Sequence, residues 1–207
     1  PGPREAAIGW VAYRTGSYYY SHGPSDLERA IVRRAREPVE SLEQAEAVLR
    51  AIRELRLSKY NHAPMLGAEA LGLPRGRDVV VVIDQTLGDV SVSGSGSDGA
   101  TFVRMIDAAI AENPGLTIAV KIHPEAISGV KKGYLAEVAR HRPVVLVTTD
   151  VNPWALIEIA RRVYVVSSQF GMEAALAGVP VTCFGAGAHA GWGLTDDRIV
   201  PIHRRNA

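Results

Sequence analysis

Residues 163–185 read VYVVSSQFGMEAALAGVPVTCFG, and this stretch decides the fold. An apolar run ends in two serines, helix-forming residues follow, and a second apolar run begins after Gly178 and Pro180. A strand, a helix and a strand joined by such short connections are typical of a βαβ unit, whose two strands are parallel. Since parallel sheets are buried on both faces, we expect helices on both sides of this one.

The same alternation extends back to Asp78. Short Val- and Ile-rich runs predict strands, and the stretches between them predict helices. The predicted strands are DVVVVID (78–84), LTIAVKI (116–122), VVLVTT (144–149), VYVVSS (163–168) and PVTCFG (180–185); the predicted helices are 100–113, 134–140, 152–162 and 171–178. The predicted fold class is α/β, a Rossmann-like parallel sheet with helices on both faces.

Residues 1–77 differ in texture and form a helical and irregular segment, separate from the domain at 78–207. Ser25 with Glu28, and Ser41 with Gln44, each match a capping box at a helix start. An apolar stripe at helical spacing follows the second box, at Leu42, Ala45, Leu49, Ile52 and Leu55. Residues 59–77 are rich in Pro and Gly and read as a connector, and the opening PGPREAAIGW suggests a fragment.

Composition excludes several classes of protein. The chain has 207 residues, a formal net charge of +1 and 22% charged residues, so it lacks the basic excess of a nucleic-acid-binding protein. One cysteine excludes a disulfide framework, and no apolar run is long enough to span a bilayer. No ligand spacing connects the six histidines, so no metal site is predicted.

Ligands of open parallel sheets bind at the carboxyl ends of the strands, so polar residues there are the candidates. After Val166, Ser167 and Ser168 with the backbone N–H groups of the next helix predict an anion cradle, with Gly171 permitting a tight turn. Glu173, expected one residue inside that helix, is placed to accept hydrogen bonds from ribose hydroxyls. The alternative is an ordinary serine-capped helix.

Two further strand ends carry candidates. Lys121 and His123 occupy alternate positions at the end of the second predicted strand, which Pro124 terminates. A lysine can neutralise a phosphate, and a histidine can donate a hydrogen bond to it. The alternative is a histidine that makes only local hydrogen bonds. The loop after the first predicted strand contains Asp84, Gln85, Asp89 and Ser91. A carboxylate at such a position can act as a nucleophile or as a base. The alternative is an aspartate that only forms a turn.

Gly94, Gly96 and Gly99 spell GxGxxG, but they come too late after their strand for a dinucleotide fingerprint. We interpret residues 93–99 as a mobile or substrate-covering loop. Cys183 is predicted to be core, Asp196–Asp197 a solvated turn, and the pairs Arg161–Arg162 and Arg204–Arg205 solvated charges.

Eight segments in this order resemble capsule polysaccharide biosynthesis proteins of the KpsC type. They are SYYYSHGPSDLE, LSKYN, VVIDQTLGDVSVSG, ENPGLTIAVKIHPE, KKGYL, DVNPWALI, VYVVSSQFGMEAALAGVPVTCFG and AGWGLTDDR. The resemblance implies a retaining β-Kdo glycosyltransferase of Gram-negative bacteria, which transfers Kdo from CMP-Kdo to a lipid-linked Kdo acceptor. It implies a GT-B architecture in which residues 78–207 bind the nucleotide sugar and residues 1–77 are a remnant of the acceptor side.

The resemblance also assigns roles. It implies Asp89 as the nucleophile, positioned by Gln85 and Ser91, and His123 as a group that stabilises the leaving phosphate. The CMP site that it implies consists of Lys121, His123, Pro124, Ser167, Ser168, Gln169, Gly171 and Glu173. It implies no cofactor, no metal and a cytoplasmic protein, with peripheral contact at the inner face of the inner membrane as a further expectation.

This sequence departs from the family's pattern in three places. The family's acidic Glu-Asp-Gly-Phe motif is absent, its YYDA is Tyr19–Tyr20–Ser21–His22, and its Pro-Phe-Tyr is Gly187–Ala188–His189. Two alternatives stay open. Glu173, Ala174, Gly178 and Pro180 also fit a UDP-sugar-dependent GT-B transferase or epimerase, and a non-catalytic GT-B-like scaffold domain is the third interpretation.

Overall fold

The computed structural model describes residues 14–17, 19–36, 42–76, 78–199 and 204. Its centre is a parallel sheet in the order β3-β2-β1-β4-β5-β6. The strands are β1 (Val79–Ile83), β2 (Thr117–Lys121), β3 (Val145–Val147), β4 (Ala160–Val165), β5 (Val181–Cys183) and β6 (Asp196–Asp197). This is the Rossmann order, in which the direction of strand addition reverses between β1 and β4. The predicted fold class is confirmed.

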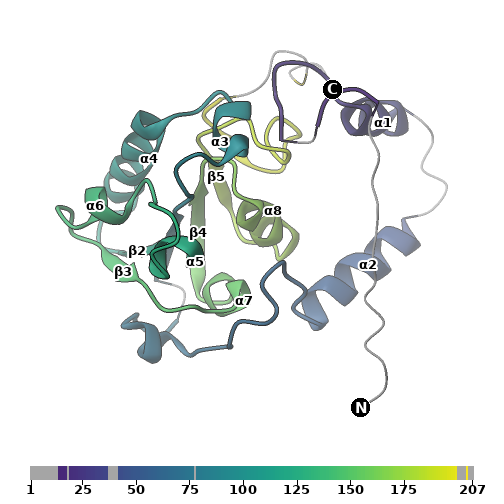
Figure 1. The fold of residues 1–207 in the computed structure, drawn as a ribbon. Helices are drawn as coiled ribbons and strands as arrows, with labels where there is room; N and C mark the ends of the chain where they lie inside the picture. Colours follow the sequence, from purple (N-terminus) through teal and green to yellow (C-terminus); the bar gives the residue numbers. More distant parts are fainter. Residues whose placement is uncertain (1–13, 18, 37–41, 77, 200–203, 205–207) are drawn as a thin grey trace.

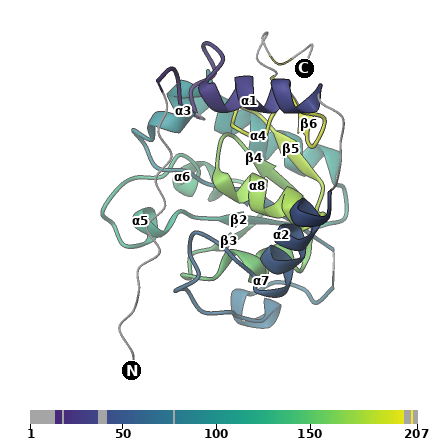
Figure 2. The same cartoon turned by 90° about the vertical axis from the view of Figure 1, so that its right-hand side faces the viewer.

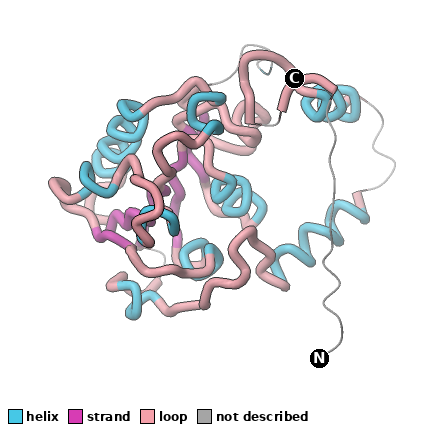
Figure 3. The backbone as a smooth tube through the Cα atoms, viewed as in Figure 1, coloured by secondary structure: helices cyan, strands magenta, loops and turns pink. Residues whose placement is uncertain are grey.

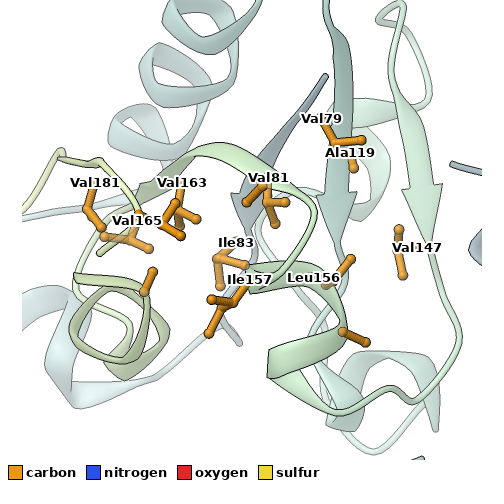
Figure 4. Packing of buried hydrophobic residues seen from close by; sticks show 14 of the residues in the cluster. Val79, Val81, Ile83, Ala119, Val147, Leu156, Ile157, Val163, Val165 and Val181 are labelled. Carbon is orange, nitrogen blue, oxygen red and sulfur yellow. The ribbon is translucent and has the colours of Figure 1, made fainter. Parts of the chain in front are cut away.

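The two faces of the sheet bury separate apolar clusters because successive side chains of a strand point to opposite faces. Val79, Val81 and Ile83 pack with α7 (Pro153–Ile157) and α8 (Gln169–Leu176), as Figure 4 shows. Val80 and Val82 pack with α4 (Gly99–Glu112) and α6 (Ala136–Ala139) on the other face. Figure 1 shows these two helix layers on either side of the strands.

The segment before the sheet contains α1 (Asp26–Ala35), α2 (Glu43–Glu54) and the 3₁₀ turn η1 (Ala68–Leu71). The Ser25–Glu28 capping box of α1 is confirmed. The cap predicted at Ser41 lies outside the described residues, and α2 has Leu42 as its N-cap, without a side-chain cap. Figure 2 shows α1 and α2 on the side of the domain that carries α8.

The connector between α2 and β1 packs against the domain. Figure 3 shows it as a long loop that runs along α7. The indole N–H of Trp154 donates to the carbonyl of Leu57, and Leu71 and Leu73 enter the cluster beneath α7 and α8. Only part of the apolar stripe of α2 packs against the domain. Ile52 contacts that cluster, whereas Leu42 and Leu55 are exposed.

Four local predictions are corrected. The helix predicted to reach Arg162 ends at Ile157, because Ala160 pairs with Val79 and begins β4. The helix expected at 134–140 is a single turn, α6. Asp196–Asp197 is not a turn but a short edge strand beside β5, which two acidic residues do not signal by hydropathy. Two short helices, α3 (Val90–Gly94) and α5 (Pro124–Ile127), were not predicted.

Arg204 is a fifth correction, because it is buried rather than solvated. Its guanidinium forms an ion pair with Glu28 of α1 and donates to the carbonyls of Gly187 and Ala190. A charge removed from water needs such partners to be tolerated. Arg205 lies outside the described residues.

Cys183 is buried in β5, as predicted. In the part of the chain that the structure describes, no helix has the length and apolar character needed to cross a membrane.

Candidate functional site

A cavity of about 570 Å³ lies at the carboxyl ends of the strands. The loops after β1, β2 and β4 contribute to it, so it lies where the strand order reverses, the usual place for a ligand in this fold. The predicted site residues that line it are Gln85, Asp89, Lys121, His123, Pro124, Ser167, Ser168, Gln169 and Glu173; Gly171 is the exception. Tertiary structure thus brings together residues that the sequence placed at three separate strand ends.

Asp89 is the carboxylate with the best access to the cavity. It caps α3, and its Oδ1 accepts hydrogen bonds from the backbone N–H (2.8 Å) and the hydroxyl (2.7 Å) of Ser91. Its Oδ2 accepts one from the amide of Gln85 at 3.1 Å. Burial alone would raise the pKa of Asp89, but these hydrogen bonds outweigh it and lower the pKa below its ordinary value. The group is therefore an ionised carboxylate at neutral pH.

The buried side chain of Gln85 joins two loops across the switch point. Its Nε2 donates to Asp89, Ser91 and Ser167, with donor–acceptor distances between 3.1 and 3.2 Å. Its Oε1 accepts from the backbone N–H of Ser167 at 3.1 Å. One amide therefore fixes the carboxylate after β1 relative to the serine after β4.

His123 is the N-cap of α5, where its Nδ1 accepts a hydrogen bond from the backbone N–H of Glu125 at 3.2 Å. A neutral ring that accepts at Nδ1 carries its proton on Nε2. Burial lowers the pKa of His123 even though Glu125 and Asp89 oppose the change, so the neutral form dominates near pH 7. Nε2 lies 3.5 Å from the hydroxyl oxygen of Tyr60, and His123 lines the cavity as a possible hydrogen-bond donor.

Ser168 caps α8 through a hydrogen bond from the backbone N–H of Phe170 at 3.3 Å. Since the serine pair lines the cavity, the N-terminus of α8 faces it. The positive end of the helix dipole favours an anion at this point.

Gly171 and Glu173 differ from the prediction in their local roles. Gly171 lies inside α8, where a Cβ atom would stand 2.6 Å from Nε2 of His189 and 2.8 Å from the side chain of Val165. It is glycine because of close packing, not because of a turn. Glu173 is the fifth residue of α8 rather than one residue inside it.

The carboxylate of Glu173 accepts from the hydroxyl of Ser58 at 2.8 Å and from the backbone N–H of Lys59 at 3.3 Å. Burial raises the pKa of Glu173, against the effect of those two hydrogen bonds. Contact with ribose hydroxyls stays a prediction.

Asp84 and Lys121 line the cavity but are buried; contact between Lys121 and a phosphate stays a prediction. Asp84 is 1% exposed and accepts hydrogen bonds from the backbone N–H groups of Gln85, Tyr134 and Leu135. Burial raises the pKa of Asp84 to about 6 and lowers that of Lys121 to about 8. The ammonium of Lys121 already donates to the carbonyl of Ile122 at 2.8 Å.

The loop at residues 93–99 is not a mobile cover. Ser95 and Ser97 are buried, and the carbonyl of Ser95 accepts a hydrogen bond from the backbone N–H of Ala186. A Cβ atom on Gly185 would stand 2.5 Å from the hydroxyl oxygen of Ser97. The small residues of this loop pack against the chain after β5, which composition alone does not reveal.

Among the residues of the cavity wall that were not predicted as site residues are Lys59, Tyr60 and His189. Lys59 and Tyr60 belong to the connector, which no strand-end rule covers. His189 is 1% exposed, and burial lowers its pKa to about 4. Across the described ranges, no group of three or more His, Cys, Asp or Glu residues could hold a metal ion.

Residues 10–207 match the family model described as "Capsule polysaccharide biosynthesis protein". The "Capsule polysaccharide modification protein LipA" of Neisseria meningitidis serogroup B is 43% identical over 190 residues, which is 91% of this chain and 27% of that protein. The "Lipopolysaccharide-processing protein LpsZ" of Rhizobium meliloti is 31% identical over 92% of this chain and 43% of that protein.

Two solved structures share the fold. One is "Thermosulfurimonas dismutans KpsC, beta Kdo 2,4 transferase", with a TM-score of 0.82 and 42% identity, covering 93% of this chain and 59% of that one. The other, the "beta Kdo 2,7 transferase" of the same source, has a TM-score of 0.68 and 28% identity, covering 94% of this chain and 57% of that one. The chain thus spans less than two thirds of each of these relatives, and it belongs to the capsule polysaccharide biosynthesis protein family.

Proposed function

We propose that this chain forms the donor-binding half of a retaining β-Kdo glycosyltransferase, which transfers Kdo from CMP-Kdo to a lipid-linked Kdo acceptor during capsular polysaccharide biosynthesis. One observation carries the proposal: an ionised carboxylate, a neutral histidine and a serine-capped helix start line a single cavity at the switch point of the sheet. The likeness to two Kdo transferases supports the sugar.

The phosphate of CMP is bound by donors in this scheme. Ser168 and the N-terminus of α8 supply hydrogen-bond donors and a favourable dipole, and Nε2–H of His123 supplies a further donor. Because charge accumulates on the phosphate as CMP leaves, fixed donors stabilise the transition state more than the bound donor sugar.

The transfer proceeds by two displacements. A carboxylate oxygen of Asp89 attacks the anomeric carbon of Kdo, the bond from that carbon to the phosphate oxygen breaks, and CMP leaves with the bonding electron pair. A hydroxyl oxygen of the acceptor then attacks the same carbon, the carboxylate of Asp89 leaves, and a general base takes the hydroxyl proton. Two inversions at one carbon give retention.

The acceptor determines where the reaction takes place. We propose that the protein works in the cytoplasm at the inner face of the inner membrane, because the acceptor of this scheme is a lipid. No cofactor takes part in the scheme.

Calorimetric titration of the purified chain with CMP, UDP and NAD tests donor choice. We expect CMP to bind, and Ser168→Ala and His123→Ala each to weaken it about tenfold, as the loss of one hydrogen bond to a charged group would. Ser93→Ala, at an exposed serine outside the cavity lining, is the matched control. A preference for UDP would contradict the CMP donor and favour the UDP-sugar alternative.

The first displacement needs only the donor. We therefore expect intact-mass spectrometry to detect a covalent Kdo adduct after incubation with CMP-Kdo and no acceptor. A chain that binds CMP tightly but forms no adduct and releases no CMP from CMP-Kdo would contradict the catalytic role and favour a scaffold domain.

A further inference from the structure

The described cavity lining has more carboxylates than lysines, which disfavours an anionic donor unless an exposed cation pairs with it. Among the described lining residues, three carboxylates, Asp84, Asp89 and Glu173, face two lysines. Lys121 is buried, and its ammonium is engaged by the carbonyl of Ile122. Lys59 is exposed, so its ammonium can turn towards a ligand at little desolvation cost.

Lys59 lies on a short segment that we name the strap, residues 57–61, and the strap is fixed at several points. Trp154 donates to the carbonyl of Leu57 at 3.0 Å, and the side chain of Asn61 accepts from the backbone N–H of Ser58 at 2.6 Å. Glu173 of α8 binds the hydroxyl of Ser58 and the backbone N–H of Lys59. The backbone next to the ammonium is therefore held against α8, whose N-terminus faces the cavity.

The strap also reaches the histidine of the site. The hydroxyl oxygen of Tyr60 lies 3.5 Å from Nε2 of His123, and the ammonium of Lys59 lies 5.4 Å from the centroid of the Tyr60 ring. The Lys59 ammonium, the Tyr60 hydroxyl and the His123 imidazole are therefore successive neighbours in the lining of the cavity. A cation over an aromatic ring is attracted to the ring, and at an exposed site this attraction is weak, so it costs little for the ammonium to pair with a ligand instead.

We propose that the strap is a substrate-binding element in which the ammonium of Lys59 pairs with an anionic group of the donor, and that Glu173 is its positioning residue. The inference rests on the proposed function, since it names how an anionic sugar nucleotide is held there. Two donor groups share this chemistry, the phosphate of the nucleotide and the carboxylate of the sugar.

Titration of the wild type and Lys59→Met with CMP and with CMP-Kdo tests the ion pair. We expect about tenfold weaker binding of CMP-Kdo, because a charge-assisted contact is lost. An equal loss for CMP assigns Lys59 to the phosphate, and a loss confined to CMP-Kdo assigns it to the carboxylate. Lys132→Met, an exposed lysine outside the cavity lining, is the matched control and should bind like the wild type.

The role of Glu173 is tested through Lys59. We expect Glu173→Ala to weaken binding, Glu173→Gln to restore most of it because the amide oxygen still accepts a hydrogen bond, and the double variant Glu173→Ala/Lys59→Met to bind no worse than Lys59→Met alone. If Glu173→Ala fails to fold, Ser58→Ala replaces it, since that change removes only the hydroxyl between Glu173 and the backbone N–H of Tyr60.

Wild-type affinity for both ligands in Lys59→Met would overturn the inference while leaving the proposed function intact. Additive losses in the double variant would overturn the positioning role of Glu173. If the wild type itself binds neither CMP nor CMP-Kdo, the proposed function fails, and the inference fails with it.

Discussion

A cavity lies at each end of the sheet. The two cavities differ in how much of the hydrogen-bonding capacity of their polar groups is already used within the protein. The cavity at the amino ends is the larger, about 760 Å³ against about 570 Å³. Three of its polar groups bind one another, since the hydroxyl of Tyr164 donates to Glu112 and accepts from Asn113; Glu112 also accepts from Arg198, outside the cavity lining. Cavity size is therefore a poor guide to the functional end.

At the carboxyl ends, groups are positioned but retain capacity for a ligand. Within the described residues, Oδ2 of Asp89 accepts one hydrogen bond, from the amide of Gln85, and the hydroxyl oxygen of Tyr60 lies 3.5 Å from Nε2 of His123. Satisfied networks contribute stability, whereas positioned groups with spare donors and acceptors contribute binding. Changes at the carboxyl ends should thus alter ligand binding or turnover, and changes at the amino ends should alter only stability.

The largest effect is expected for Asp89→Asn. An amide is a far poorer nucleophile than a carboxylate, so transfer should fall at least about 10³-fold. CMP affinity should change little, because the amide oxygen of Asn can still accept the two hydrogen bonds from Ser91 that hold this side chain. Product formation from CMP-Kdo measures transfer, and calorimetric titration measures CMP affinity. A transfer rate within tenfold of the wild type would show that Asp89 is not the nucleophile.

The second effect concerns pH and His189, which packs under the start of α8. Its pKa of about 4 in the folded chain is below the ordinary value of 6.5, so the unfolded chain binds more protons between these values. Stability from this residue therefore falls as pH falls from about 6.5 to about 4, by up to about 3 kcal/mol. Asp84, whose pKa is raised to about 6, acts in the opposite direction over much of the same range.

A comparison of the wild type with His189→Asn isolates this contribution, because Asp84 is common to both chains. We expect the stability difference between them, measured by urea unfolding, to shrink as pH is lowered from 7 to 4. A difference that stays constant over this range would show that His189 is not held neutral by the fold.

The third expected effect is on packing at the carboxyl ends. Gly171→Ala places a methyl group 2.6 Å from Nε2 of His189 and 2.8 Å from Val165, which forces the neighbours apart. We expect a loss of about 1–3 kcal/mol in the free energy of unfolding, as for other overpacked sites. Gly178→Ala is unsuitable as a control because its φ is +85°, whereas Gly67→Ala meets nothing within 4 Å and should be nearly neutral.

A smaller effect is expected for Gln85→Ala, which disconnects the loops after β1 and β4. Asp89 keeps its hydrogen bonds from Ser91 but loses the amide that fixes its Oδ2, so we expect transfer to fall about tenfold. Because Gln85 acts through Asp89, Gln85→Ala in an Asp89→Asn background should cost no further activity. Additive losses would instead show that Gln85 acts through a second route, either through Ser167, which it also binds, or through the substrate itself.

The smallest effect is expected at the amino ends. Tyr164→Phe removes the hydroxyl that links Glu112 and Asn113, and the free energy of unfolding should fall by about 1 kcal/mol. CMP affinity and transfer should be unchanged. A loss of transfer with CMP affinity intact would break the contrast between the two ends and assign a functional role to the amino-end cavity.

Prediction from sequence worked best where a pattern repeats over several residues. The valine run of β1 and the 14-residue helix α4 stood out, and so did the serine cap of α8 and the proline-started helix after Asn152. It failed where long-range pairing decides: β6 consists of two aspartates that pair with β5, and Ala160 becomes strand because Val79 lies beside it. Local propensity carries no information about such partners.

The candidate site shows the same division. The residue types at the strand ends predicted Asp89, His123 and Ser168, because parallel strands must deliver their loops to one edge. Lys59 and Tyr60 were missed because the connector is held at the cavity by contacts with His123, Trp154 and Glu173, all of them far away in sequence.

By itself the sequence determined the parallel α/β domain, the positions of its strand ends and the kinds of side chain placed there, since hydrophobic periodicity and capping are local properties. Only the tertiary structure decided that Asp84 is buried while Asp89 stays partly exposed in the same cavity, that Gly171 makes room for His189, and that Arg204 is buried against Glu28. The physical reason is that burial, pKa and spare hydrogen-bonding capacity depend on neighbours that the fold assembles from distant parts of the chain.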